Sequence, residues 1–116
     1  MAGQDCIFCR IVAGAIPAAV VHREDAIVAF RDVDPQAPTH ILVIPTRHVE
    51  TLNALDSSDG ALMGRLILAA KQIAEQEGIA ESGYRLVLNT ERGAGQSVFH
   101  LHLHVLGGRA MRWPPG

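Results

Sequence analysis

Most of the chain shows the alternation of apolar and polar residues, or the short apolar runs, that are typical of β-strands. Such segments, bounded by turn residues, predict five strands at residues 20–23, 27–30, 40–44, 84–88 and 98–106. Glu24 and Asp25 form the tight turn between the first two strands, and Pro45 ends the third. The pattern therefore predicts a protein built mainly from short strands.

Helical spacing is found in one long segment and one short segment. Apolar residues recur at intervals of three and four between Leu62 and Ala74, with polar residues around the other side. Residues 56–59 offer several N-cap side chains before this helix, and Gly78 supplies its C-terminal stop. Residues 6–12 predict a second, short helix near the start of the chain.

The order of these elements favours an α+β fold. The strands arrive in hairpin-like pairs rather than in repeated β-α-β units, so we expect a five-stranded antiparallel sheet with one long and one short helix. A length of 116 residues suits one domain, which we expect to span residues 1–116. No internal repeat or low-complexity segment divides the chain.

Composition and charge exclude several kinds of protein. Hydrophobic residues make up 48% of the chain and charged residues 19%, which is typical of a globular rather than a disordered protein. The net charge of −2 and the aromatic content of 4% argue against a nucleic-acid partner. The first residues carry no signal-peptide pattern, and the apolar stretch 13–21 is too short to cross a bilayer. We therefore expect a cytoplasmic protein with no membrane partner.

Three of the six histidines alternate with apolar residues near the end of the chain. His100, His102 and His104 share one face of the predicted strand, while Leu101 and Leu103 lie on the other. Each imidazole can donate or accept a hydrogen bond, bind a metal or attack an electrophile near neutral pH. A chance polar face on a half-buried strand is the alternative, but the rarity of such a row favours a functional site.

Residues 100–106, His-Leu-His-Leu-His-Val-Leu, resemble the histidine triad motif of the histidine triad (HIT) nucleotide-binding superfamily. Further segments are similar to the same family, namely residues 30–40, 44–48 and 95–99. The ending 106–116 is similar to its Hint branch. The resemblance implies a homodimeric hydrolase, with the sheet extended across the dimer, that cleaves purine nucleoside phosphoramidates into an amine and a nucleoside monophosphate.

The resemblance also implies roles for individual residues. His102 is the nucleophile, and His104 stabilises charge on the phosphate or passes a proton to the leaving amine. Asn89 and Ser97 hydrogen-bond the phosphate, and Asp32 accepts both ribose hydroxyls. The other expected nucleotide contacts are Phe8, Phe30 and Val33 around the base, together with His40, Gly95, Gln96 and Val98.

These residue types suit that reaction. A neutral imidazole attacks phosphorus, the amine leaves, and water then hydrolyses the nucleotidyl-histidine. In the family, a backbone carbonyl holds one ring nitrogen as N–H so that the other carries the attacking lone pair. The two oxygens of Asp32 can accept one ribose hydroxyl each. On the residues alone, Asp32 is equally a solvated acid, the apolar residues are equally core, and the glycine loop is equally a simple turn.

Cys6 and Cys9 have the two-residue spacing of half a zinc site. By resemblance to several superfamily members, His48 and His100 complete the site and leave the middle histidine of the triad free to attack. Four protein ligands leave no open position, so we expect structural zinc and a reaction that requires no cofactor. A redox pair and two small buried side chains are the alternatives. The same resemblance puts His40 beside this cluster, where we expect it to order the histidine network.

Other functions are open on the same residues. Within the same enzyme class, dinucleoside polyphosphate hydrolysis and nucleotidyl transfer are the alternatives. A non-catalytic nucleotide-binding regulatory module is another, although it has no need of a poised nucleophile. A zinc-dependent structural module would unfold when its metal is chelated. Purine nucleoside phosphoramidate hydrolysis is the function that the sequence favours.

Overall fold

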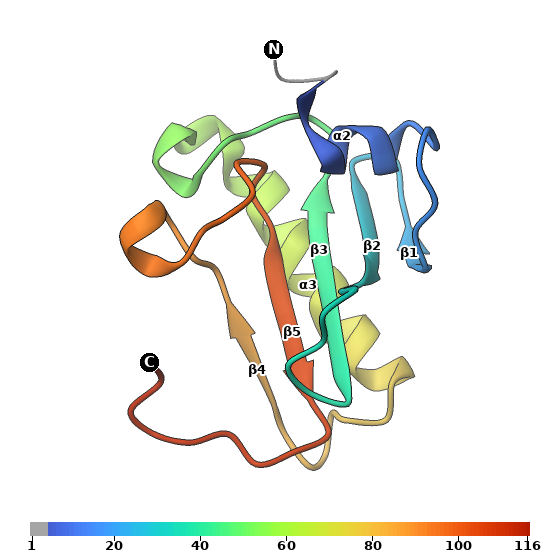
Figure 1. Ribbon diagram of the computed structural model, residues 1–116, viewed down its shortest axis with the longest axis vertical. Helices are drawn as coiled ribbons and strands as arrows, with labels where there is room; N and C mark the ends of the chain where they lie inside the picture. Colours follow the sequence, from blue (N-terminus) through green and yellow to red (C-terminus); the bar gives the residue numbers. More distant parts are fainter. Residues whose placement is uncertain (1–4) are drawn as a thin grey trace.

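The computed structural model of the protein describes residues 5–116 (Figure 1). Its strands are β1 (Val20–Arg23), β2 (Ile27–Arg31), β3 (Thr39–Pro45), β4 (Tyr84–Val87) and β5 (Leu103–Gly107). They form one antiparallel sheet in the order β1-β2-β3-β5-β4. The helices are α2 (Ile7–Val12) and α3 (Gly60–Gln76), with three 3-10 turns, η1 (Leu52–Ala54), η2 (Ser57–Asp59) and η3 (Arg92–Ala94).

The predicted α+β class, with five antiparallel strands, one long helix and one short helix, is confirmed. Residues 1–4 lie outside the described residues. They are part of the predicted domain and of the first residues, in which we expect no signal peptide. Among residues 5–116, no helix has the length and apolar character needed to cross a bilayer.

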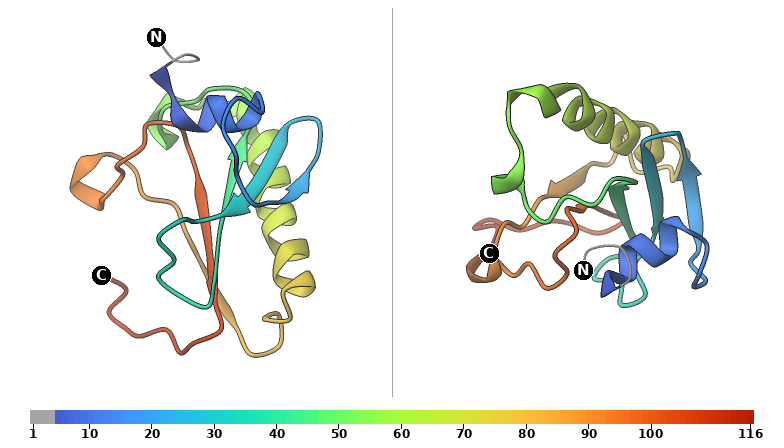
Figure 2. Two further views of the ribbon diagram at one scale, coloured as in Figure 1. Left: turned by 45° about the vertical axis from the view of Figure 1, so that its right-hand side comes forward. Right: turned by 90° about the horizontal axis from the view of Figure 1, so that it is seen from above.

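The sheet separates two apolar clusters, and α3 and α2 cover its opposite faces (Figure 2). Along β3, Ile41 and Val43 pack with α3, whereas Leu42 and Ile44 pack with α2. Because both faces of this strand are covered, its sequence is a continuous apolar run rather than an alternation. The central strands thus supply side chains to the α3 core and to the space beneath α2.

The last strand is shorter than predicted. β5 begins at Leu103, whereas the pattern predicts a strand from residue 98, and that start is wrong. The ladder with β3 extends no further than the pair Val43–Leu103. Before it, the N–H of Leu101 donates to the carbonyl of Val49 at 2.6 Å, outside the sheet. The apolar side chains of residues 101, 103 and 105 still pack with α3, so the predicted alternation of faces holds beyond the strand itself.

The ends of α3 follow the predicted signals. Asp56 accepts the N–H of Ser58 at 2.8 Å, and Asp59 accepts the N–H of Asp56 at 3.0 Å, so this capping box forms η2 just before the helix. Gly78, with φ of +75°, follows the last turn in the left-handed conformation that favours glycine.

Candidate active site and metal cluster

A cavity of about 330 Å³ lies beneath α2, and we call it the α2 cavity. Most of its wall is apolar and comes from α2, the segment after it, β2 and β3: Ile7, Phe8, Ile11, Ile16, Pro17, Ala18, Phe30, Val33, Leu42 and Val98. Its polar lining consists of Arg31, Asp32, Ser97, His102 and His104. The cavity therefore joins an apolar slot to a group of imidazoles, a carboxylate and a hydroxyl.

His102 has a fixed tautomer. Its Nδ1 lies 2.8 Å from the backbone oxygen of His100. Since a carbonyl oxygen only accepts, Nδ1 carries the proton and Nε2 keeps a lone pair. Burial lowers the pKa of His102 below its ordinary value, although this hydrogen bond and the charge of Asp32 act in the opposite direction. The ring is therefore neutral at pH 7, with one nitrogen available for attack.

His104 is fixed by a chain of hydrogen bonds that starts at a backbone amide. The N–H of Gln36 donates to Nδ1 of His40 at 3.0 Å, so the proton of a neutral His40 lies on Nε2. This Nε2–H donates to Nδ1 of His104 at 2.8 Å. Burial, with the neighbouring rings of His102 and His40, lowers the pKa of His104 to about 4. His104 is therefore neutral, with its proton on Nε2.

This Nε2 atom of His104 is buried and has no hydrogen-bond partner among residues 5–116. A buried donor without an acceptor is costly in a folded protein. Because His104 lines the α2 cavity, a ligand that brings an acceptor oxygen can satisfy it. The arrangement suits an anionic oxygen placed beside the lone pair of His102.

Asp32 lies between the histidine chain and the cavity. Its Oδ1 accepts the N–H of Asp34 at 2.8 Å, and its Oδ2 lies 3.4 Å from Nε2 of His40. Each carboxylate oxygen has further accepting capacity. Val33 beside it is fully exposed at the cavity wall. The carboxylate can therefore take hydroxyl donors from a ligand while its own position is held by the protein.

The segment from Asn89 to Ser97 carries the predicted phosphate contacts. Ser97 is exposed and lines the α2 cavity, whereas Asn89 is half-buried at the end of β4 and is not among the lining residues. Glu91 has φ of +70° and Gly95 has φ of +95°. The strained backbone at Glu91 is unusual for a residue other than glycine and is a feature of functional loops.

Gln96 holds this segment together and is only 3% exposed. Its Oε1 accepts the N–H of Glu91 at 2.8 Å, and its Nε2 donates to the carbonyls of Glu50 at 2.8 Å and Val98 at 3.1 Å. Both donor hydrogens of the amide are thus used within the protein, and its oxygen accepts one hydrogen bond. The side chain therefore holds the segment between Glu91 and Val98 in place.

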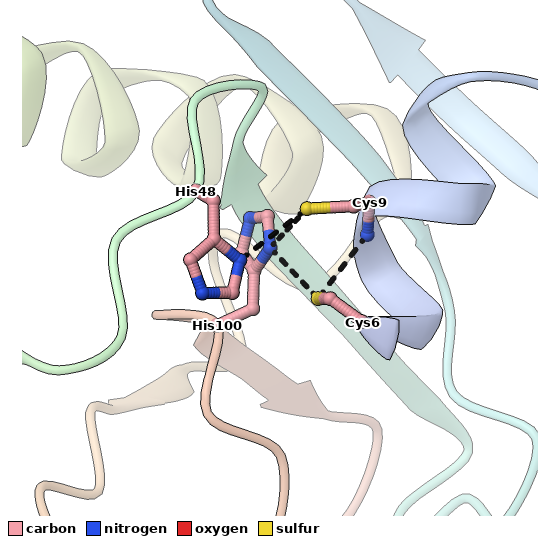
Figure 3. A group of neighbouring side chains, drawn as sticks. All are labelled: Cys6, Cys9, His48 and His100. Carbon is pink, nitrogen blue, oxygen red and sulfur yellow. Dashed lines mark hydrogen bonds between the residues drawn. The ribbon is translucent and has the colours of Figure 1, made fainter. Parts of the chain in front are cut away.

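The four residues suggested as metal ligands lie together (Figure 3). Sγ of Cys6 lies 3.3 Å from Nδ1 of His100, and Sγ of Cys9 lies 3.3 Å from Nδ1 of His48 and 3.5 Å from Nδ1 of His100. The four donor atoms are all within 4.8 Å of one another. Tetrahedral zinc, with Zn–S of about 2.3 Å and Zn–N of about 2.0 Å, separates sulfur and nitrogen ligands by roughly 3.5 Å.

The imidazole of His100 is oriented for this cluster. Its Nε2 donates to the carbonyl of Pro45 at 2.8 Å, so Nδ1 faces the sulfur atoms with a lone pair. Burial, reinforced by Cys6, raises the pKa of Cys9 to about 11, so a cation is needed to hold this sulfur as a thiolate. The donor set and its spacing fit a structural zinc ion.

His40 does not lie where the resemblance puts it. It pairs with Leu106 near the start of β3, whereas His48 follows the other end of that strand. It therefore joins Asp32 and His104 rather than the cysteine cluster. Sequence reasoning also missed two backbone groups, the N–H of Gln36 and the carbonyl of Pro45. No side-chain pattern could have indicated them.

Comparisons with known proteins identify the family of this chain. The model of the HIT domain family matches residues 13–111. The chain is 49% identical over 108 residues to the purine nucleoside phosphoramidase of Escherichia coli (strain K12). These residues cover 93% of this chain and 91% of that protein. It is 51% identical over 113 residues to an uncharacterized HIT-like protein of Synechococcus elongatus, with 97% and 98% covered.

Among solved structures, this chain is similar to a HIT family hydrolase from Legionella pneumophila, with 52% sequence identity and a TM-score of 0.95. The match covers 97% of this chain and 100% of that chain. A HIT family hydrolase from Clostridium thermocellum is 38% identical with a TM-score of 0.92, over 94% and 95%. The sheet and its histidine row thus define a histidine triad fold. The chain belongs to the HIT domain family, and its relatives identify it as a hydrolase.

Proposed function

We propose that this protein hydrolyses purine nucleoside phosphoramidates to a nucleoside monophosphate and an amine. The observation that carries the proposal is the tautomer of His102, whose Nδ1 is committed to the carbonyl of His100 and whose Nε2 keeps its lone pair beside a cavity. The E. coli relative named purine nucleoside phosphoramidase supports the same reaction.

In the first step, Nε2 of His102 forms a bond to phosphorus while the P–N bond of the substrate breaks. The amine leaves with a proton taken up from water. In the second step, water attacks phosphorus, the bond to Nε2 breaks, and the nucleoside monophosphate is released. The attacking water gives up one proton to the solvent, which balances the proton that the amine took up. The Nε2–H of His104 donates to a phosphoryl oxygen, which satisfies the buried donor and stabilises the developing charge.

The rest of the substrate occupies the α2 cavity. The base takes the apolar slot formed by Phe8, Phe30 and Val33, and Asp32 accepts the ribose hydroxyls. Ser97 and Asn89, with the backbone of residues 95–98, hold the phosphate. Gln96 contributes through the shape of its segment, and His40 contributes through His104.

Cys6, Cys9, His48 and His100 would hold a structural zinc ion. Such an ion would fix α2 to the segments after β3 and before β5, and it would leave no open coordination position for catalysis. We also propose a homodimer in which the sheet continues across two subunits, a single domain over residues 1–116 and a cytoplasmic location.

The decisive experiment is mass spectrometry of enzyme quenched while it turns over an adenosine phosphoramidate. We expect a nucleotide adduct on the peptide that contains His102. A His102→Asn variant should bind the nucleoside monophosphate but show no turnover, and His22→Asn, on β1 outside the cavity, serves as control. Full activity of the His102 variant would refute the covalent step. Faster cleavage of a dinucleoside polyphosphate than of the phosphoramidate would favour the alternative substrate.

A further inference from the structure

A second hollow, of about 390 Å³, adjoins the α2 cavity. Both are lined by Ile7, Ser97 and Val98. We call it the Glu50 hollow, because Glu50 forms part of its wall together with Asp5, His48 and Phe99. The proposed placement of base, ribose and phosphate leaves this hollow unused.

The position of the hollow matters because a phosphoramidate is larger than a nucleotide. In the proposed function, the base and ribose fill the α2 cavity and the phosphate lies at Ser97 and His102. The amine is bonded to phosphorus, so it begins where the nucleotide ends. Ser97 belongs to both walls, and a substituent on the amine can therefore continue across it into the Glu50 hollow.

Outside the cysteine cluster, the charged residues among those that line the hollow are acidic. Glu50 is exposed, and its backbone carbonyl is fixed by the amide of Gln96 at 2.8 Å. Asp5 lies on the same wall, and no Lys or Arg is among the lining residues of the described chain. Arg92 lies over the ring of Phe99, 5.2 Å from its centroid, without itself lining the hollow. Two thiolates balance a divalent cation, so a filled cysteine cluster adds no net charge.

From this geometry we infer that the Glu50 hollow is the subsite for the leaving amine and that it favours amines carrying a second positive charge, such as an alkylammonium group. The inference rests on the proposed function and names the substrate class within it. A carboxylate near an exposed cation contributes modestly, so the expected preference is about two- to fivefold in kcat/KM.

The test compares three adenosine 5′-phosphoramidates whose leaving amines are a diaminohexane, an aminohexanol and an aminohexanoate. The hexyl chain keeps the distant group from altering the P–N bond, so the three differ only in remote charge. We expect the cationic amine to be cleaved most efficiently and the anionic amine least. Added salt should reduce the difference.

Variants assign the preference to a residue. Glu50→Gln should bring the cationic-to-neutral ratio close to one, and Glu50→Lys should invert the order. Glu81→Gln, an exposed acid outside the lining of either cavity, should leave the wild-type ratio unchanged. Equal cleavage of all three compounds by the wild type, or a preference that survives Glu50→Lys, would overturn the subsite but not the hydrolase. If none of the compounds is cleaved, the proposed function itself fails and the subsite with it.

Discussion

Replacing Gln96 by leucine tests whether this residue holds the phosphate segment or contacts the nucleotide directly. The side chain makes three hydrogen bonds, to the N–H of Glu91 and to the carbonyls of Glu50 and Val98, and it is almost completely buried. Leucine has a similar volume but makes none of these bonds. Gln96→Leu therefore leaves one donor and two acceptors of the backbone without their partner.

Each such bond contributes about 1 kcal/mol net, so the free energy of unfolding should fall by about 3 kcal/mol. For a chain of this size, that corresponds to a decrease in Tm of roughly 10 to 15 °C. Loss of the bond to Glu91 also frees a residue with φ of +70°, so the segment before Ser97 should relax. We expect KM for the phosphoramidate to rise along with the loss of stability.

The assay is chemical and thermal unfolding followed by circular dichroism at one fixed protein concentration, because association would make Tm depend on concentration. Gln72→Leu, an exposed position on α3, is the matched control and should change stability by less than about 0.5 kcal/mol. A loss of stability below about 1 kcal/mol in Gln96→Leu, accompanied by a tenfold loss of nucleotide affinity, would show that the amide contacts the ligand directly.

Three further predictions concern the histidines and the metal cluster. The pKa of His104 is about 4 in the folded protein and about 6.5 in an unfolded chain, so the stability from its neutral form is present above pH 6.5 and is lost as the pH falls toward 4, by about 3 kcal/mol in all. The free energy of unfolding, measured from pH 7.5 to 5, should show this decline, and His104→Asn should reduce its slope. Treatment with a chelator should remove one zinc per chain, measured by metal analysis, and should lower Tm, measured by calorimetry. A structural ion would be contradicted if Tm changed neither on chelation of the wild type nor in the Cys9→Ser variant. His40→Phe removes the donor to His104 and should lower kcat about tenfold or more, whereas unchanged kcat would show that His104 needs no such partner. The same change breaks both hydrogen bonds of the His40 ring, so the free energy of unfolding should also fall by about 2 kcal/mol.

The sequence predicted the fold well because the fold depends on apolar periodicity. Both helices and all five strands lie where the pattern indicates them, usually within a residue or two. The start of β5 was wrong because apolar alternation continues through Leu101, although the backbone there pairs with Val49 instead of the sheet. Alternation reports which face a side chain takes, and it carries no information about which backbone accepts the hydrogen bond.

The candidate site was predictable in its residues but not in its connections. The cysteine pair, the histidine row and the family resemblance predicted a group of four residues, Cys6, Cys9, His48 and His100, and the structure brings these four together. His40 is separate from that cluster because of the length of β3. His40 lies near the start of this strand, whereas His48 follows its other end. Spacing along the chain gives residue types, whereas the registry of the sheet decides which of them meet.

The roles proposed for the three histidines differ because a different group of the protein binds one nitrogen of each ring. A backbone carbonyl accepts from Nε2 of His100, which turns Nδ1 toward the cysteine sulfurs, where it would be a ligand of the proposed zinc ion. A second carbonyl, that of His100 itself, accepts from Nδ1 of His102 and leaves Nε2 with the lone pair that the proposed attack on phosphorus needs. Nδ1 of His104 instead accepts a hydrogen bond from Nε2–H of His40, whose own Nδ1 accepts a backbone N–H, so the other nitrogen of His104 carries a proton and can donate. In the proposed function, three identical side chains in one short segment thus serve as a metal ligand, a nucleophile and a hydrogen-bond donor. A chain that kept all three histidines but lost the carbonyl or amide behind any one of them would keep the motif and lose the corresponding chemistry.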